Sequence, residues 1–299
     1  MMMVRLRLVP IGRKVRSGLS LILRTNSGRI GLPLVLVFLF LTISGPWLGD
    51  WLPHSPTEMP EPMAEYQLLP PSWQFWMGTD QYGRDILSRV LTGATSLVLT
   101  AGVGAGLGII LGTVVGISSG YKGGRVDEVV MRVMDGLMSF PTLLLALLVL
   151  FTLGPSRVNI AATIGFVSMP SIARVVRSTT LSLKSMEFIQ SARLRGESTA
   201  YIIFREILPN VMPVIGVEAS VRMSYAILSV ASLGFLGLGI QPPSPDWGLA
   251  ISMGRRFLIS APWIAVAPII AISLLVLSLN LLSDGIRQAS NMARDEGQP

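Results

Sequence analysis

Side chains able to carry out covalent or metal chemistry are scarce in this 299-residue sequence. It contains no cysteine and one histidine, His54, which lies in a proline-rich polar loop and is expected to be a solvated loop residue. Disulfides, thiolate nucleophiles and Cys/His metal sites are therefore excluded or nearly so. No histidine falls in a long apolar run and no two acids stand at a catalytic spacing, so an enzyme would lack a visible nucleophile.

Two glycine-containing segments have a superficial likeness to nucleotide-binding loops. Gly78 to Asp85 carries Arg84 and Asp85 where a phosphate loop needs lysine followed by serine or threonine. The pattern at Gly102 and Gly104 follows no predicted strand, which a dinucleotide-binding turn would require. The sequence therefore predicts no nucleotide or other cofactor bound by this chain.

One pair of opposite charges stands inside an apolar run. Glu218 and Arg222 are four residues apart, so on a helix they share a face and can form an ion pair. Ionisable groups inside a membrane are costly and are functional candidates by default. Two alternatives stay open: a gate or packing pair at membrane depth, or a position near the inner surface, where long side chains reach water.

Long uncharged runs provide the elements that must hold these residues. Only 14% of the residues are charged and 51% are hydrophobic, which leaves too few charges to cover a soluble globule. A bilayer core needs roughly 20 apolar helical residues to cross it. Four uncharged runs reach that length, at 30–49, 90–121, 136–156 and 257–283. Two weaker spans, about 158–175 and 211–233, complete a predicted all-α membrane protein with six transmembrane helices.

Basic residues indicate how these helices are oriented. With a cytoplasmic N-terminus, the inner segments hold 18 Lys and Arg residues and the outer segments hold 5. This distribution fits the positive-inside rule and predicts that both termini are cytoplasmic. An arm for nucleic acid would instead collect the charge in one tract, so no nucleic acid is expected as a partner.

The six spans divide the chain into parts. These are a basic cytoplasmic arm at 1–29, a first helix at 30–49, an outer loop at 50–90, a core with the other five helices at 91–285 and a cytoplasmic tail at 286–299. Pro141 is expected to kink the third span, which is predicted to begin near Gly136. The outer loop, rich in proline, is long enough to cover the outer mouth.

Five glycines recur every four residues in the second span, which places them on one helix face. They are Gly104, Gly108, Gly112, Gly116 and Gly120. In lipid, small residues let two helix backbones approach closely. The spacing therefore predicts a tightly packed seam with another helix.

The inner segment at 176–209 carries the clearest functional pattern. A short helix from Glu187 is followed by Gly196, which breaks or caps it, and Ser198 can cap a second helix that Pro209 ends before the membrane. This unit is too polar for lipid and too short to fold alone. It therefore needs a partner at the cytoplasmic face, with an ordinary solvated loop as the alternative.

In this segment Gln190, Ser191 and Ala192 are followed by Gly196 and a closing Ile-Leu-Pro-Asn. The pattern resembles the EAA motif of binding-protein-dependent ABC importer permeases, in which Glu-Ala-Ala is usual at the first three positions. Gln190 lacks the charge of the usual acid. The resemblance implies a coupling helix that docks on an ATPase subunit through Gln190, Ser191, Ala192, Arg193, Arg195, Gly196, Glu197 and Ser198.

Four further segments are similar to the branch of this family that imports dipeptides, oligopeptides and nickel complexes. They are GTDQYGRDILSRV at 78–90, MRVMDGLMSFP at 131–141, SLGFLGLGIQPPSPDWG at 232–248 and LLSDGIRQA at 281–289. The first is an outer family motif that contains Gly78, Thr79, Asp80, Gly83, Arg84 and Asp85.

The resemblance implies a type I ABC importer permease fold in a bacterial cytoplasmic membrane. Its expected partners are a second, related permease that forms a heterodimer, two cytoplasmic ATPase subunits that hold ATP and Mg, and an extracytoplasmic solute-binding protein. Transport would proceed by alternating access. An ion-coupled secondary transporter is the alternative, but it needs buried titratable groups near the midplane, and the uncharged spans offer almost none.

Overall fold

The computed structural model describes residues 21–52, 57, 60 and 63–295, and His54 lies outside them. The all-α prediction is confirmed, because the regular elements of the described residues are helices. Five of these helices are long and apolar enough to cross a membrane. They are α2 (Asn26–Trp51), α4 (Ile86–Lys122), α7 (Arg157–Lys184), α10 (Leu208–Phe235) and α12 (Trp263–Asp295).

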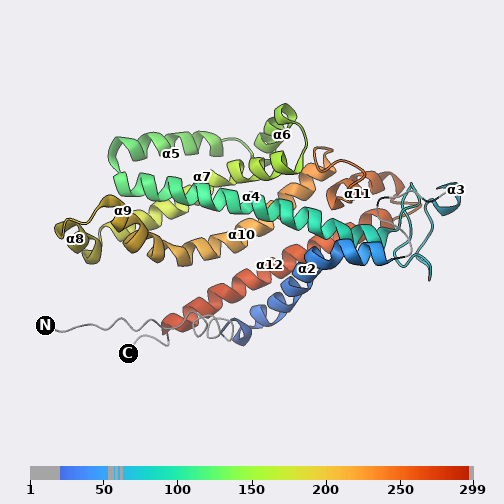
Figure 1. Cartoon of the computed structure of the whole chain (residues 1–299), viewed down its shortest axis with the longest axis horizontal. Coiled ribbons are helices and arrows are strands. Elements are labelled where there is room, and N and C mark those ends of the chain that lie inside the picture. The colour runs from blue at the N-terminus through green and yellow to red at the C-terminus, as the bar shows by residue number, and fades with distance from the viewer. Residues whose placement is uncertain (1–20, 53–56, 58–59, 61–62, 296–299) are drawn as a thin grey trace.

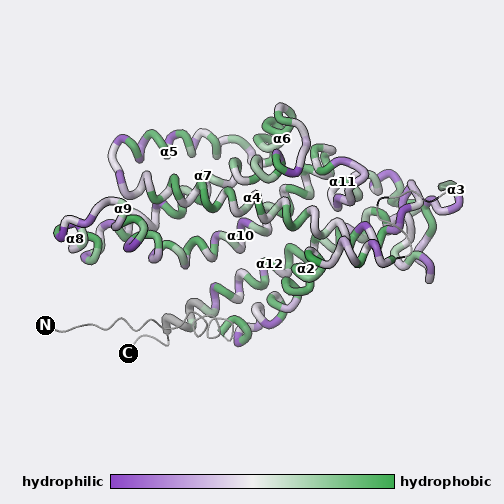
Figure 2. Tube along the Cα trace, viewed as in Figure 1, coloured by the Kyte–Doolittle hydropathy of each residue, from purple (hydrophilic) through white to green (hydrophobic). Residues whose placement is uncertain are grey.

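The long helices form one bundle with distinct ends. α4 and α7 lie side by side, α2 packs against α4 and α12, and α10 contacts α4, α7 and α12 (Figure 1). The short helices α8 (Glu187–Leu194) and α9 (Thr199–Tyr201) lie at the end where α2 begins and α12 finishes. The helices α3 (Met63–Tyr66) and α11 (Trp247–Gly254) lie at the opposite end. Figure 2 shows hydrophobic residues along the middles of the long helices and hydrophilic residues gathered at both ends.

The third span differs from the expectation. Instead of one kinked helix from Gly136, the structure has α5 (Gly124–Met138) and α6 (Thr142–Leu153), bent by 88° at the break between them. Pro141 stands at the break. The helix is interrupted there because proline disfavours a helical conformation in the residue before it and has no N–H to donate. α6 has 12 residues, too few to cross alone. Counted as one broken span, the pair brings the number of crossings to six.

Several helices extend beyond their expected ends. α4 begins at Ile86 because the Asp85 carboxylate accepts hydrogen bonds from the backbone N–H groups of Leu87 and Ser88. The outer loop therefore ends at Asp85 and not at residue 90. α7 continues to Lys184, and α12 continues past residue 282 to Asp295. The outer segment at 234–262 contains a helix that was not expected, α11.

The prediction that Pro209 ends a helix before the membrane is wrong. The chain passes from α9 through a π-helical stretch, Ile202–Ile207, directly into α10, and Pro209 lies in the first turn of α10. The π turn just before Pro209, in which Leu208 N–H reaches the Ile203 carbonyl, is wider than an α-helical turn. This local widening accommodates Pro209 within the helix. The chain from Thr199 to Phe235 is thus one continuous helical rod.

The glycine face of α4 lies along α7. A methyl group added at Gly112 would come within 2.7 Å of the Ile172 Cβ, and one at Gly116 within 2.6 Å of the Ala173 carbonyl oxygen. Gly104, Gly108 and Gly120 meet α7 in the same way. The two backbones therefore approach as closely as the four-residue spacing predicts.

Candidate functional site

The segment with the EAA-like pattern forms a compact elbow, defined here as residues Glu187–Ser198. Its helix ends in a Schellman motif: Gly196 N–H donates to the Arg193 carbonyl at 2.9 Å and Glu197 N–H to the Ala192 carbonyl at 3.2 Å. Gly196 has φ of +77°, a left-handed conformation that favours glycine. Ser198 then accepts a hydrogen bond from Tyr201 N–H and caps α9. The reversal of chain direction thus depends on Gly196 and Ser198.

One face of the elbow is fixed to the bundle. Ile189 and Ala192 are fully buried, in a cluster that also contains Ile202 and Ile207 of the rod leading into α10. The Arg193 guanidinium lies 5.1 Å from the ring centre of Tyr121, at the end of α4, where a cation-π contact holds it. Ala192 therefore positions the elbow and does not offer a contact surface.

The opposite face of the elbow is open. The exposed members of the expected docking set are Gln190, Ser191, Arg193, Arg195, Gly196 and Ser198, whereas Glu197 is half-buried beside Arg195. Sequence reasoning omitted Leu194 from that set, yet its side chain is 89% exposed. The sequence could have indicated this exposure. Ile189 and Ala192 are spaced i, i+3 and define the face of α8 that points inward, and Leu194 does not fall on that face. A large apolar side chain fully presented at a polar end suits a protein contact.

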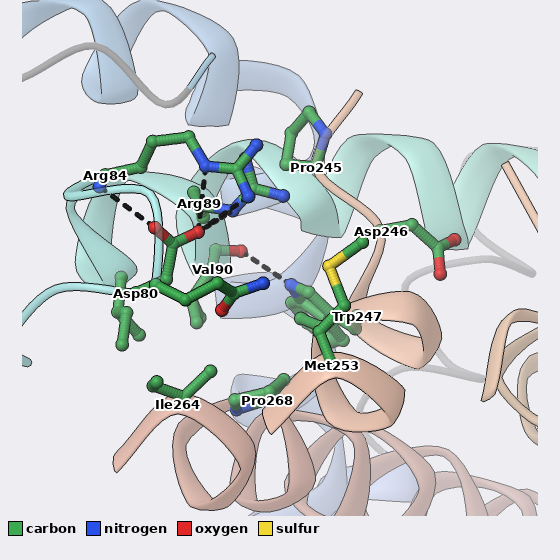
Figure 3. A pocket seen from close by; sticks show the side chains of 13 residues that line it. Asp80, Arg84, Arg89, Val90, Pro245, Asp246, Trp247, Met253, Ile264 and Pro268 are labelled. Carbon is green, nitrogen blue, oxygen red and sulfur yellow. Dashed lines mark hydrogen bonds and ion pairs between the residues drawn. The ribbon is translucent and has the colours of Figure 1, made fainter. Parts of the chain in front are cut away.

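At the other end, the outer family motif forms a buried ionic cluster. The Asp80 carboxylate accepts hydrogen bonds from Tyr82 N–H, Arg84 N–H and Arg84 Nε, and its Oδ2 lies 2.7 Å from Arg84 Nη2. Arg89 Nε approaches the same oxygen at 3.9 Å. Figure 3 shows Asp80 facing both arginines. Asp80 and Arg84 are almost fully buried, so the pair closes the loop on itself, and Arg89 is the residue of α4 that approaches it.

Two tryptophans bring distant segments to this cluster. Trp247 of α11 donates its indole N–H to the Val90 carbonyl at 3.0 Å, and Gly93 leaves room for its ring. Trp263 at the start of α12 donates to the Thr79 carbonyl at 3.1 Å, with Gly78 close against it. The two family-like segments at 78–90 and 232–248, which are far apart in the sequence, therefore meet in space (Figure 3).

The geometry leaves no phosphate site in the motif. The N–H groups that a phosphate would need at the start of α4 are taken by the Asp85 carboxylate, and two more N–H groups point to Asp80. Both acceptors are acidic, so they would repel an anion. Among the described residues no group of three His, Cys, Asp or Glu side chains is placed to hold a metal ion.

Asp246, the residue just before α11, is expected to make the stability of the protein depend on pH. The residue is 1% exposed, and its carboxylate caps α11 through Leu249 N–H and points away from Asp80 (Figure 3). Burial raises its pKa to about 6, against about 3.9 in an unfolded chain. Between pH 4 and pH 6 the folded protein keeps a proton that the unfolded chain has lost, so stability falls as the pH rises through this window.

Asp246→Asn should remove this pH dependence, because asparagine keeps an oxygen for Leu249 N–H and does not titrate. We expect the wild-type protein to lose on the order of 2–3 kcal/mol between pH 4 and pH 7 relative to the variant. Thermal unfolding of both proteins in detergent, measured across that range, tests it. Parallel pH profiles would contradict the assignment.

The Glu218 and Arg222 side chains form the ion pair that their spacing allows. Arg222 Nε lies 3.0 Å from Glu218 Oε2, and both side chains are about one-fifth exposed. Arg222 stands near the midpoint of α10, far from either end of the helix. Arg222 lines a cavity together with residues of α4, α6 and α7.

Known proteins similar to this chain cover most of its length. Residues 108–292 match the family described as "Binding-protein-dependent transport system inner membrane component". A di/tripeptide transport system permease protein, DppC, of Pseudomonas aeruginosa is 35% identical over 88% of each chain. A dipeptide transport system permease protein of Alkalihalophilus pseudofirmus is 40% identical, over 87% of this chain and 84% of its own. A glutathione transport system permease protein, GsiD, of Shigella dysenteriae is 46% identical, over 73% and 72%.

This chain belongs to the family of inner-membrane permease components of binding-protein-dependent ABC importers. A solved structure of the MetNI methionine ABC transporter in an inward-facing conformation shares the fold. It has a TM-score of 0.56 and 16% identity, and the match covers 67% of this chain and 96% of that one. The type I importer permease fold is thereby confirmed.

Proposed function

We propose that this chain is one of two related permease subunits of an ATP-driven importer of small peptides or of similar solutes such as nickel chelates. The observation that carries the solute class is its similarity, over most of both chains, to permeases named for di- and tripeptides, dipeptides and glutathione. The partner permease would be a different chain, so the pair is a heterodimer. A binding protein would deliver the solute to the end that carries α3 and α11.

ATP and Mg belong, in this proposal, to two ATPase subunits that dock on the elbow. The open face with Leu194 supports this, because a partner would cover the exposed leucine. The chain itself would bind no cofactor. The excess of basic residues at the inner segments, together with the start of α2 and the end of α12 on the side of α8, supports cytoplasmic termini.

The proposed mechanism is alternating access driven through the elbow. Ile189 and Ala192 pack on Ile202 and Ile207, so a push on α8 displaces the helical rod that continues as α10. A packed cluster transmits displacement because it resists compression. α10 would tilt against α4 and α7 and would exchange an inward-open cavity for an outward-open one.

Leu194→Ser tests the docking. Because the side chain is exposed, the substitution should leave the permease stable while lowering ATP-dependent uptake and ATPase co-purification at least about tenfold. For ATPase co-purification the matched control is Ile259→Ser, which removes another fully exposed aliphatic side chain at the opposite end of the bundle, away from the elbow. Unchanged uptake and co-purification in the Leu194 variant would contradict docking at this face.

The alternative, an ion-coupled secondary transporter, makes a different prediction. Proteoliposomes that contain this chain without ATPase subunits would then take up solute when a proton gradient is applied. Under our proposal they do not, and uptake requires ATP together with the ATPase subunits. Labelling of Arg193 or Arg195 from outside intact cells would also overturn the proposed orientation.

A further inference from the structure

A half-enclosed cavity with several polar side chains in its lining lies at the middle of the bundle, between α4, α6, α7 and α10. Its volume is about 240 Å³. The lining residues Ala105, Ser168 and Arg222 each stand near the midpoint of a long helix, so the cavity is at mid-depth. Its polar lining consists of Thr142, Ser168, Ser171, Arg222, Tyr225 and Ser229.

Arg222 uses only part of its hydrogen-bonding capacity. Among the described residues its guanidinium donates one hydrogen bond, from Nε to Glu218, and its two terminal amino groups have no acceptor. Arg177 of α7 provides a contrast, because both its Nε and its Nη2 donate to the Asp127 carboxylate. Arg177 thus ties α7 to α5, whereas Arg222 keeps the planar fork that binds two oxygens.

The hydroxyl groups around Arg222 are also available. Within the described residues the side chains of Thr142, Tyr225 and Ser229 make no hydrogen bond, although all three line the cavity. Polar groups at membrane depth are costly unless they are paired or serve a water-filled path. An apolar solute would leave them unpaired, whereas a carboxylate would accept from the guanidinium and from neighbouring hydroxyls.

We infer that this cavity is a carboxylate-binding subsite of the transport path, in which the terminal amino groups of Arg222 hold a carboxylate of the solute and the Tyr225 hydroxyl assists. The inference rests on the proposed function and names a recognition site for it. Glu218 keeps the subsite weak, because its carboxylate neutralises and partly occupies the guanidinium. A transporter needs such a balance, since a site that binds too tightly does not release.

The test compares a dipeptide that has a free C-terminal carboxylate with its C-terminal amide. The complete complex, with partner permease, ATPases and binding protein, is reconstituted, and kcat/KM for uptake of each compound is measured. We expect Arg222→Gln to lower the acid-to-amide ratio about tenfold or more. Arg222→Lys should retain part of the preference. The binding protein is the same throughout, so a change in the ratio reports the permease.

Arg132→Gln is the matched control, because Arg132 also pairs with a glutamate four residues earlier but on the exposed face of α5. Its ratio should equal that of the wild type. An unchanged ratio in Arg222→Gln, with both compounds slowed equally, would show a gate or packing pair and overturn the subsite. If Arg222→Gln fails to assemble, Tyr225→Phe is measured instead, with a several-fold loss of the ratio expected and an unchanged ratio again contradicting the subsite. A wild-type complex that takes up neither compound would overturn small peptides as the solute in the proposed function, and the subsite with it.

Discussion

Asp80→Ala is expected to lower the free energy of unfolding by about 3–5 kcal/mol, one of the two largest effects in this protein. The carboxylate is almost fully buried and accepts from the backbone and the guanidinium of Arg84, with Arg89 close to the same oxygen. Its removal leaves the buried Arg84 charge without the carboxylate that it contacts, and leaves two loop N–H groups without an acceptor.

Two variants separate charge from hydrogen bonding in this test. Asp80→Asn keeps an acceptor for Tyr82 and Arg84 N–H, so it should cost less than alanine, although it loses the ion pair. Glu128→Ala removes one partner of a solvent-exposed pair and should cost no more than about 0.5 kcal/mol. Thermal and denaturant unfolding in detergent provide the measurement. Equal, small losses for Asp80→Ala and Glu128→Ala would show that the cluster is not essential to stability.

Features that depend on local spacing were predictable from the sequence. The glycine face of α4 and the turn at Gly196 each follow from residues within a few turns of one another. The spans with uncharged runs of 20 residues or more were likewise found, except where Pro141 divides the third. There, a hydrophobic count could not distinguish a kink from a bend of 88°.

The outer cluster could not be derived in this way. Its indole hydrogen bonds join Trp247 to Val90 and Trp263 to Thr79, positions more than 150 residues apart. A helix end also depends on such context: π-helical geometry carries the chain past Pro209, which taken alone indicates a stop.

The central cavity illustrates the same limit for function. The four-residue spacing of Glu218 and Arg222 predicted that they can pair, but it left their depth open. The cavity beside them is made by four helices, and no segment of the sequence contains its lining. The structure therefore changes the question about Arg222 from whether it pairs to which of its donors remain available.

The seam between α4 and α7 should respond to one added methyl group with opposite signs at two glycines of the same helix. Gly112→Ala places a Cβ 2.7 Å from the Ile172 Cβ and 2.9 Å from the Met169 carbonyl oxygen. Because the second neighbour is backbone, relief requires the helices to separate, at a cost of about 1–3 kcal/mol, and Gly112→Leu should prevent native packing.

Gly106→Ala is the matched substitution, because nothing lies within 4 Å of the added Cβ. It should stabilise the protein by about 0.5–1 kcal/mol, since alanine loses less backbone entropy than glycine in a helix. Gly116→Ala, whose Cβ would meet the Ala173 carbonyl oxygen at 2.6 Å, should behave like Gly112→Ala. Unfolding midpoints in the same detergent decide the matter. If alanine stabilises the protein equally at positions 106, 112 and 116, then the seam is not tightly packed, and the α4 glycines have another purpose than close approach to α7.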